Sequence, residues 1–280
     1  MGFASKRNIA QVFAFLAITA GIYYPAIDWL VDAWLGNDYY NHGFFLLAFS
    51  VFLVWLSRKR LREAIPDRQH RGLPALIFAL SLYLAGFLTG EAVVLSFSLI
   101  FFIAALCLQF LGWQRTRLLL FPIFLPALAI PIPSFYEFGI WLQDVSASGA
   151  SGFSSLLGMD VSSNGNDITV GGETYHVAPA CSGLNRVMPL FSLTAIIAYI
   201  LEGAIWKKMF LLALVIPFAL FSNIVRITIT LWAGSTWGAD VAMSFFHDFS
   251  SIVLFLVAVI MIVLTAFLLG ILQLRRGIIP

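Results

Sequence analysis

The chain has 280 residues, of which 61% are hydrophobic and only 11% are charged, with a net charge of +2. Soluble domains are about half apolar and about one quarter charged, so this composition excludes an ordinary soluble protein. The mean hydropathy is +0.94, and apolar stretches long enough to cross a hydrocarbon core of about 30 Å recur along the chain. The sequence therefore predicts an all-α polytopic membrane protein, and its small net charge gives no reason to expect a nucleic-acid partner.

About eight transmembrane helices are expected, forming a single integral membrane domain over residues 1–280. The short basic start of the chain lacks a small-residue cleavage site, so a retained first span is expected rather than a removed signal peptide. The predicted spans cover residues 8–30, 43–57, 72–89, 93–111, 117–131, 184–201, 208–233 and 249–272.

The basic residues orient these spans, because Lys and Arg gather in the cytoplasmic loops of membrane proteins. With a cytoplasmic N-terminus, all of the 16 Lys and Arg residues except Arg186 and Arg226 lie on the cytoplasmic side. Both termini are therefore predicted to be cytoplasmic. An Arg inside a span costs about 2.5–3.5 kcal/mol, so Arg226 is expected to face a polar cavity or a partner, with a structural ion pair as the alternative. Arg186 is only two residues into its helix and can snorkel to the outer headgroups.

One sizeable segment outside the membrane, residues 132–183, is predicted to form an outer cap. Apolar residues at helical spacing between Phe135 and Leu157 predict an amphipathic helix that lies on the membrane. Residues 166–178 alternate around a Gly-Gly pair and predict a small β-hairpin. The hairpin leads directly to Cys181, so the cap is expected to position this cysteine and to shape a groove for an extended peptide.

Cys181 has the features of a reactive thiol. Cys107 is expected deep in the fourth span, near its cytoplasmic end, so a disulfide between the two is excluded. A lone thiol at an oxidising face is unusual for a structural cysteine, whereas an inert buried thiol is expected for Cys107. Cys181 also precedes a helix, and both a helix N-terminus and a nearby cation favour the nucleophilic thiolate.

Alternate crossing of the membrane places Cys181, Arg226 and His247 at the same face. A thiol, a guanidinium and an imidazole are the groups that a cysteine acyl-transfer site needs. His247 opens the last span and can pass a proton to the leaving amine. Asn223 lies three residues before Arg226 on the same helical face and can orient it.

Further polar residues surround these positions. Ser182 and Gly183 allow a tight turn whose backbone N–H groups can point at an oxyanion, and Asp248 can orient polar partners. His42, at the outer start of the second span, can line the same pocket or mark the membrane interface. His176 is a rival base, for which plain solvation is the alternative.

Three motifs resemble the exosortase/archaeosortase family. They are Ala-Cys-Ser-Gly-Leu at the head of a span, Asn-x-x-Arg from Asn223 to Arg226, and His-Asp-Phe-Ser at residues 247–250. The similarity extends to His-Gly-Phe at residues 42–44 and to the outer segment, and it covers most of residues 40–260. Pro179 stands where many members carry Glu, which can mark a subfamily with a different recognition motif.

The resemblance implies a membrane-embedded transpeptidase in which Cys181 is the nucleophile, Arg226 stabilises the oxyanion and His247 is the acid and base. The implied partners, besides membrane lipid, are exported proteins with a C-terminal sorting signal: a short motif such as Pro-Glu-Pro, a hydrophobic helix and a basic cluster. Cleavage would form an acyl-enzyme thioester that passes to an unknown acceptor. An intramembrane cysteine protease that uses water, or a transporter, is the alternative. No cofactor and no metal are expected, and the site is placed at the outer (periplasmic) face of a bacterial inner membrane.

Overall fold

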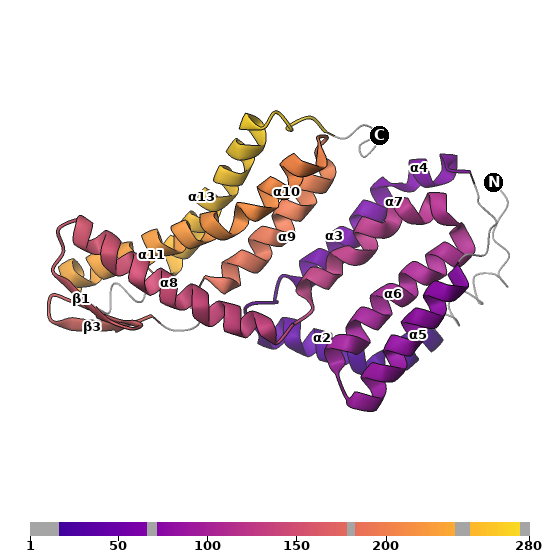
Figure 1. Cartoon of the computed structure of the whole chain (residues 1–280), viewed down its shortest axis with the longest axis horizontal. Coiled ribbons are helices and arrows are strands. Elements are labelled where there is room, and N and C mark those ends of the chain that lie inside the picture. Colours follow the sequence, from indigo (N-terminus) through magenta and orange to yellow (C-terminus); the bar gives the residue numbers. More distant parts are fainter. Residues whose placement is uncertain (1–16, 66–71, 178–182, 239–246, 275–280) are drawn as a thin grey trace. The chain divides into compact units, whose positions relative to one another are not determined.

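The computed structural model describes residues 17–65, 72–177, 183–238 and 247–274, with the backbone alone for residues 247–251. Contacts within the chain divide it into two compact units, residues 1–131 and residues 132–279. Both units are mainly helical, and the strands that the structure describes all belong to the second unit (Figure 1).

The first unit is a set of mainly apolar helices. Because lipid cannot satisfy polar groups, buried hydroxyls link these helices: Tyr23 hydrogen-bonds to Ser98 at 2.9 Å, and Ser98 donates to the carbonyl of Ala79 at 3.0 Å. The helices are α2 (Tyr24–Gly36), α3 (Gly43–Leu56), α4 (Arg58–Glu63), α5 (Gly72–Thr89), α6 (Ala92–Leu111), α7 (Trp113–Phe124) and the 3-10 helix η1 (Leu125–Ala129).

Two prolines interrupt the chain where α7 gives way to η1. Pro126 has no N–H and cannot donate to the carbonyl of Pro122, four residues earlier. Ser50 of α3 donates to that carbonyl instead, and the indole N–H of Trp34 in α2 donates to the carbonyl of Ala129 at 2.8 Å. The predicted span 117–131 is therefore a helix broken near its C-terminal end, where the carbonyls of Pro122 and Ala129 accept hydrogen bonds from neighbouring helices.

The second unit is built around one long helix. Helix α11 contacts α8, α9, α10 and α13. The elements of this unit, in chain order, are α8 (Ser134–Leu156), β1 (Val161–Asn164), β2 (Asp167–Val170), β3 (Glu173–His176), α9 (Leu184–Ile200), α10 (Ile205–Ala213), α11 (Val215–Trp237) and α13 (His247–Leu268).

Two lysines hold the helix ends together at one side of this unit. The Nζ atom of Lys208 donates to the carbonyl of Leu201, just after α9, at 2.6 Å, and the Nζ atom of Lys207 donates to the carbonyl of Leu269, just after α13, at 2.6 Å. Cations at helix C-termini satisfy the last carbonyls and oppose the helix dipole. Helices α9 and α13 thus both end beside the start of α10, so they run opposite to α10, as alternate crossing predicts.

The predicted hairpin is present as the second half of a three-stranded antiparallel sheet of order β1-β2-β3. Strands β2 and β3 pair from Asp167 opposite His176 to Val170 opposite Glu173. The turn between them consists of Gly171 and Gly172, both at positive φ, as a two-residue hairpin turn requires. Strand β1 was not predicted. Its residues, Val-Ser-Ser-Asn, are mostly exposed and polar, so their pairing rests on backbone hydrogen bonds.

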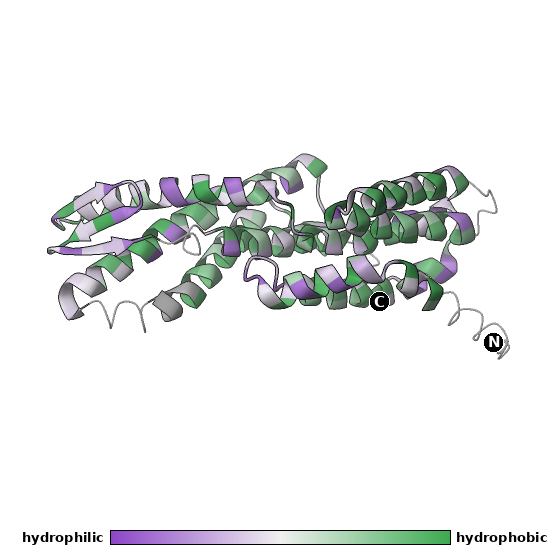
Figure 2. Cartoon of the chain, turned by 90° about the horizontal axis from the view of Figure 1, so that it is seen from below, coloured by the Kyte–Doolittle hydropathy of each residue, from purple (hydrophilic) through white to green (hydrophobic). Residues whose placement is uncertain are grey.

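Three helices are long and apolar enough to cross a membrane among the described residues: Gly72–Thr89, Ala92–Leu111 and the combined stretch Ile205–Trp237. A fourth arises if Trp113–Ala129 and Ser134–Leu156 count as one bent span, and the apolar helices over 43–56, 184–200 and 252–268 are shorter. The structure thus supports a helical membrane protein, whereas the expected number of eight spans is not confirmed. In Figure 2 most helices are green along much of their length, whereas the strands are mainly white and purple.

Candidate active site

Arg226 lies on α11 next to residues that pack against the sheet, such as Ile227. The stretch Ile205–Trp237 has 33 residues and is about 50 Å long at about 1.5 Å per residue, which exceeds a hydrocarbon core of about 30 Å. Its last turns are covered by the sheet, because Gly234 lies directly against the hydroxyl of Tyr175. Arg226 is about 27 Å along the helix from Lys208, so it lies where the apolar stretch meets the cap.

The side chain of Arg226 is buried in the protein interior, with only 2% exposed, and the polar cavity or partner expected for it stays a prediction. The same interior holds a polar network built on Asn223, which is fully buried. The Nη1 atom of Arg186 donates to Oδ1 of Asn223 at 3.0 Å, and Nδ2 of Asn223 donates to Oγ of Ser146 at 2.9 Å. One amide thus joins α8, α9 and α11 within one helical turn of Arg226.

Arg186 has a different environment from the one that its position in the sequence suggested. Its side chain is 8% exposed, and its guanidinium binds Asn223 instead of extending to a surface. Arg186 and Arg226 are therefore two buried cations, of which Arg186 is bonded to Asn223 and Arg226 lies about one helical turn beyond Asn223 on α11. Because a cation is costly in an apolar interior unless it is hydrogen-bonded, Asn223 has a structural role in holding Arg186, besides the role toward Arg226 that its spacing suggests.

Gly183 fixes the start of α9 against this network. It has a φ of +89°, and a Cβ atom placed on it would lie 3.2 Å from the side-chain amide of Asn223. Its carbonyl accepts hydrogen bonds from the N–H groups of Arg186 and Val187 at 2.9 and 3.0 Å. The residue is therefore glycine for two reasons: the left-handed backbone conformation and the close contact with Asn223.

Replacing Gly183 by Ala is expected to reduce both stability and activity. Gly158 provides a matched control, because it has a φ of +83° but open space where a Cβ would be. Gly158→Ala should show only the backbone strain, roughly 1–2 kcal/mol, whereas Gly183→Ala should also displace Asn223 and its partners. Thermal unfolding in detergent and substrate cleavage measure the two effects. Equal losses in the two variants would contradict the proposed contact.

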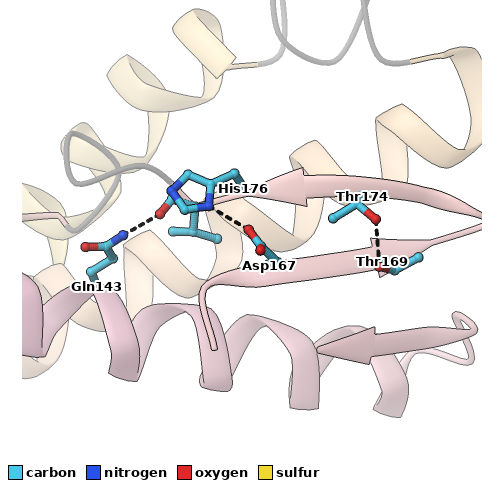
Figure 3. Close-up of polar contacts among 6 residues, drawn as sticks. Gln143, Asp167, Thr169, Thr174 and His176 are labelled. Atoms are coloured by element: carbon cyan, nitrogen blue, oxygen red, sulfur yellow. Dashed lines mark hydrogen bonds and ion pairs between the residues drawn. The ribbon is translucent and has the colours of Figure 1, made fainter. Parts of the chain in front are cut away.

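The chain is also held at the other end of the segment that carries Cys181. The Nε2 atom of Gln143, a residue of α8 that is 4% exposed, donates to the carbonyl of Val177 at 2.6 Å. The N–H of Val177 donates to the carbonyl of Asn166 at 2.9 Å. Figure 3 shows Gln143 reaching the chain beside His176. The described residues on both sides of 178–182 are thus anchored, Val177 to α8 and Gly183 to α11.

His176 forms an exposed ion pair. Its Nδ1 atom lies 2.6 Å from Oδ1 of Asp167, across the β2–β3 pair (Figure 3), and the two side chains are 62% and 53% exposed. A carboxylate only accepts, so Nδ1 carries the proton and Nε2 is the acceptor in the neutral ring. His176 is therefore an exposed residue of the sheet with a partner of its own. This is consistent with the alternative that it is a solvated side chain and not the catalytic base.

Several predicted residues lie outside what the structure describes. Cys181 and Ser182 fall between Val177 and Gly183, beyond the described residues. Helix α13 begins at His247, as predicted, and contacts α9 and α11, but the side chains of His247 and Asp248 are not described. The convergence of Cys181, Arg226 and His247 on one cavity therefore stays a prediction.

His42 belongs to the first unit, at the residue before α3. Burial lowers the pKa of its imidazole from 6.5 to about 4, so the ring is neutral at pH 7. A neutral, partly buried histidine can serve as a hydrogen-bonding group at the end of a helix, and the neutral form is the one that the fold requires.

Acidification is expected to destabilise the fold through His42. The folded pKa lies below the unfolded one, so the stabilising contribution is complete above about pH 6.5 and is lost as the pH falls toward about 4. The difference of about 2.5 pKa units limits the loss in the free energy of unfolding to about 3 kcal/mol. Thermal unfolding in detergent across this range measures the slope, and His42→Gln should flatten it. Identical slopes for the two proteins would show that His42 titrates normally.

Gln143 and Ser146 were not singled out by the sequence pattern. Both lie on the buried side of α8, together with Gly139, Ala147 and Ala150. Small and polar residues at spacings of three and four are a signal of close helix packing in membrane proteins. The same Ser/Gly-rich stretch has a low helix propensity. The residues that indicate close helix packing therefore also argue against a helix when propensity alone is considered. Among the described residues, no group of three or more His, Cys, Asp or Glu side chains is arranged to hold a metal ion.

Fold and site together define a class of protein. It is a helical membrane protein with a buried Arg-Asn-Ser network and a small sheet that precedes a cysteine in the chain. The chain matches the transmembrane exosortase family over residues 34–264, and it therefore belongs to that family. The matched region contains the cysteine motif, the Asn223–Arg226 motif and His247. Exosortases are cysteine-dependent transpeptidases or proteases that act in general on exported proteins with sorting signals. Comparison with curated proteins found no match, and neither did comparison with solved structures.

Proposed function

We propose that this protein cleaves exported proteins at a C-terminal sorting signal and transfers them to an acceptor through a thioester on Cys181. The family match over residues 34–264 is the observation that carries the proposal. The burial of Arg186 and Arg226 supports it, because a simple membrane scaffold has no use for two buried guanidiniums.

In the proposed reaction, the thiolate of Cys181 attacks the carbonyl carbon at the cleavage motif. The guanidinium of Arg226 and the backbone N–H groups of Ser182 and Gly183 stabilise the oxyanion. His247 donates a proton to the leaving amine as the C–N bond breaks, which leaves a thioester and a neutral imidazole. The acceptor nucleophile then gives its proton to His247 and attacks the thioester, which restores the thiolate.

Chain connectivity supports the pairing of Cys181 with α11. Two peptide units separate Cys181 from Gly183, so their Cα atoms are within about 8 Å. Gly183 contacts Asn223, and Arg226 lies one helical turn further along α11. The N-terminus of α9 follows Cys181 directly, and its dipole favours the thiolate.

The proposed site lies at the outer face of the cell membrane, with both chain termini in the cytoplasm. The distribution of basic residues supports this orientation. The apposed ends of α9, α10 and α13 support it as well, because they carry Lys207 and Lys208 and lie away from Arg226.

Intact-mass analysis of the processed product tests the proposed transfer. A secreted reporter fused to the motif, helix and basic tail is expressed with the enzyme, and the new C-terminus is analysed. A product heavier than the hydrolysed reporter by a constant mass supports transfer. A free carboxylate in every product would show that water is the acceptor and that the protein is an intramembrane cysteine protease. A reporter that stays full length when the wild-type protein is expressed with it would contradict both the transferase and the protease interpretation.

A further inference from the structure

One side of α3 carries a column of aromatic rings. The ring centroids of Phe45, Phe49, Phe52 and Trp55 follow one another at 5.8, 5.7 and 5.9 Å. Phe45, Phe52 and Trp55 are 56%, 46% and 55% exposed. An exposed apolar column on a membrane helix lies against lipid chains, because no water is available to it there.

The column ends at a cation. The guanidinium of Arg58 lies 3.9 Å from the centroid of the Trp55 ring, and its Nη1 atom donates to the carbonyl of Trp55 at 3.2 Å. Trp side chains gather at the membrane–water interface, and a cation held on the face of such a ring lies at headgroup depth. Helix α3 ends at Leu56, one residue after this ring, which is consistent with that depth.

Further cations lie on two elements, α4 and the start of α7. Helix α4 and the start of α7 are joined by a hydrogen bond of 3.3 Å from Nε of Arg115 to the carbonyl of Ala64. Glu63 is the one carboxylate of these two helices, and among the described residues no ion pair includes it or the cations. The cations are Arg58, Lys59, Arg60, Arg62, Arg115 and Arg117.

We propose that the aromatic column of α3 and the cations of α4 and α7 form a binding site for an anionic phospholipid. The phosphate lies among the cations, and one acyl chain lies along the rings from Trp55 toward Phe45. Arginine binds phosphate oxygens through two parallel N–H groups, and a cluster of basic residues of this size next to a membrane helix attracts anionic headgroups.

A lipid fits this site better than a soluble phosphate compound or an acidic protein. The rings and the cations are continuous, since Arg58 contacts the last ring of the column. Only a ligand with both an apolar chain and an anionic head uses both parts. The site belongs entirely to the first unit and is independent of the proposed peptide chemistry.

Lipid retention measures the site directly. The protein is purified in detergent, exchanged into nanodiscs or mixed micelles of phosphatidylcholine with or without phosphatidylglycerol, and examined by native mass spectrometry and thermal unfolding. Wild-type protein is expected to retain phosphatidylglycerol preferentially and to unfold at a higher temperature with it. Inorganic phosphate and glycerol phosphate at the same concentration should not reproduce this effect, because they cannot occupy the aromatic column.

Substitutions of the basic residues distinguish lipid binding from the general role of cations in orienting the helices in the membrane. Arg58→Gln, Lys59→Gln and Arg62→Gln together should weaken the preference for phosphatidylglycerol about 100-fold, at about fivefold for each cation. Arg58→Lys with Arg62→Lys keeps the charge that orients the helices and should keep most of the preference. Glu63→Gln, on the same helix, should not weaken it.

A second pair of variants covers the case in which the charge-depleted protein does not fold. Phe52→Leu with Trp55→Leu keeps the charge and the apolar character but removes the end of the column, and several-fold weaker retention of phosphatidylglycerol is expected. Equal retention of both lipids by wild-type protein, or unchanged preference in the Leu and Gln variants, would overturn the proposal. Equal stabilisation by inorganic phosphate would also overturn it, because the site would then bind a free anion.

Discussion

Cys181→Ala is expected to abolish substrate processing while leaving expression and membrane insertion intact. A thiolate is the only group proposed to form the covalent intermediate, so its loss removes the reaction path and not merely part of the rate. Cys181→Ser should be similarly inactive, because a hydroxyl with an ordinary pKa is a poor nucleophile without a strong adjacent base. Accumulation of full-length reporter, followed by immunoblotting, measures the effect.

Cys107→Ala serves as the matched control for this experiment. Cys107 is the other cysteine of the chain, lies in α6 of the first unit, and should be replaceable without loss of cleavage. Thiol labelling that is lost in Cys181→Ala and kept in Cys107→Ala would identify the reactive group. Normal cleavage by Cys181→Ala would remove this residue from the mechanism.

Arg226→Lys is expected to be nearly as damaging as Arg226→Ala. Lys keeps the positive charge, so simple attraction for the thiolate would largely survive. The planar fork of fixed donors is lost, however, and this fork can hold an oxyanion and a second acceptor together. Removing one oxyanion donor typically reduces turnover about 10²–10³-fold, and both variants should lose activity on that scale.

The two variants together distinguish three roles for Arg226. Near-normal activity of Arg226→Lys would show that the residue acts as a point charge. Loss of folding in Arg226→Ala would favour a structural role, since the side chain is 2% exposed. Arg186→Lys is the matched comparison, because Arg186 is also buried but binds Asn223. A lysine there can still donate to the amide, so a smaller loss is expected. Steady-state protein level and reporter cleavage are measured for each variant.

Local patterns in the sequence were sufficient to predict much of the fold. Apolar stretches identified the helices, and the Gly-Gly pair at 171–172 identified the β2–β3 hairpin, because both signals depend on neighbouring residues alone. Strand β1 was missed, since Val161–Asn164 presents a single apolar residue and pairs through its backbone. The number of eight membrane spans is not confirmed, and the donors that satisfy the break at Pro126 come from other helices, which a local pattern does not show.

The residues of the candidate site stay a prediction, and the contacts that Asn223 makes could not be predicted from the sequence. The spacing of Asn223 and Arg226 suggested a contact within one helix, and the structure also joins Asn223 to Arg186 and Ser146, which come from two other helices. Such pairings across 37 and 77 residues are set by helix packing, which no local pattern encodes. Gly183 was singled out for its turn, but its contact with Asn223 is a tertiary feature as well.

The Asn223 network also sets the order in which the site assembles during synthesis. Ser146 and Arg186 leave the ribosome before their shared partner, and Asn223 follows Arg186 by 37 residues. At about 5–20 residues per second, Arg186 waits roughly 2–7 s for its acceptor. During that interval its guanidinium is stable only near the headgroups, where water solvates it. The start of α9 is therefore expected to reach its final depth only after α11 has inserted, which completes the Asn223 network before α13 adds His247.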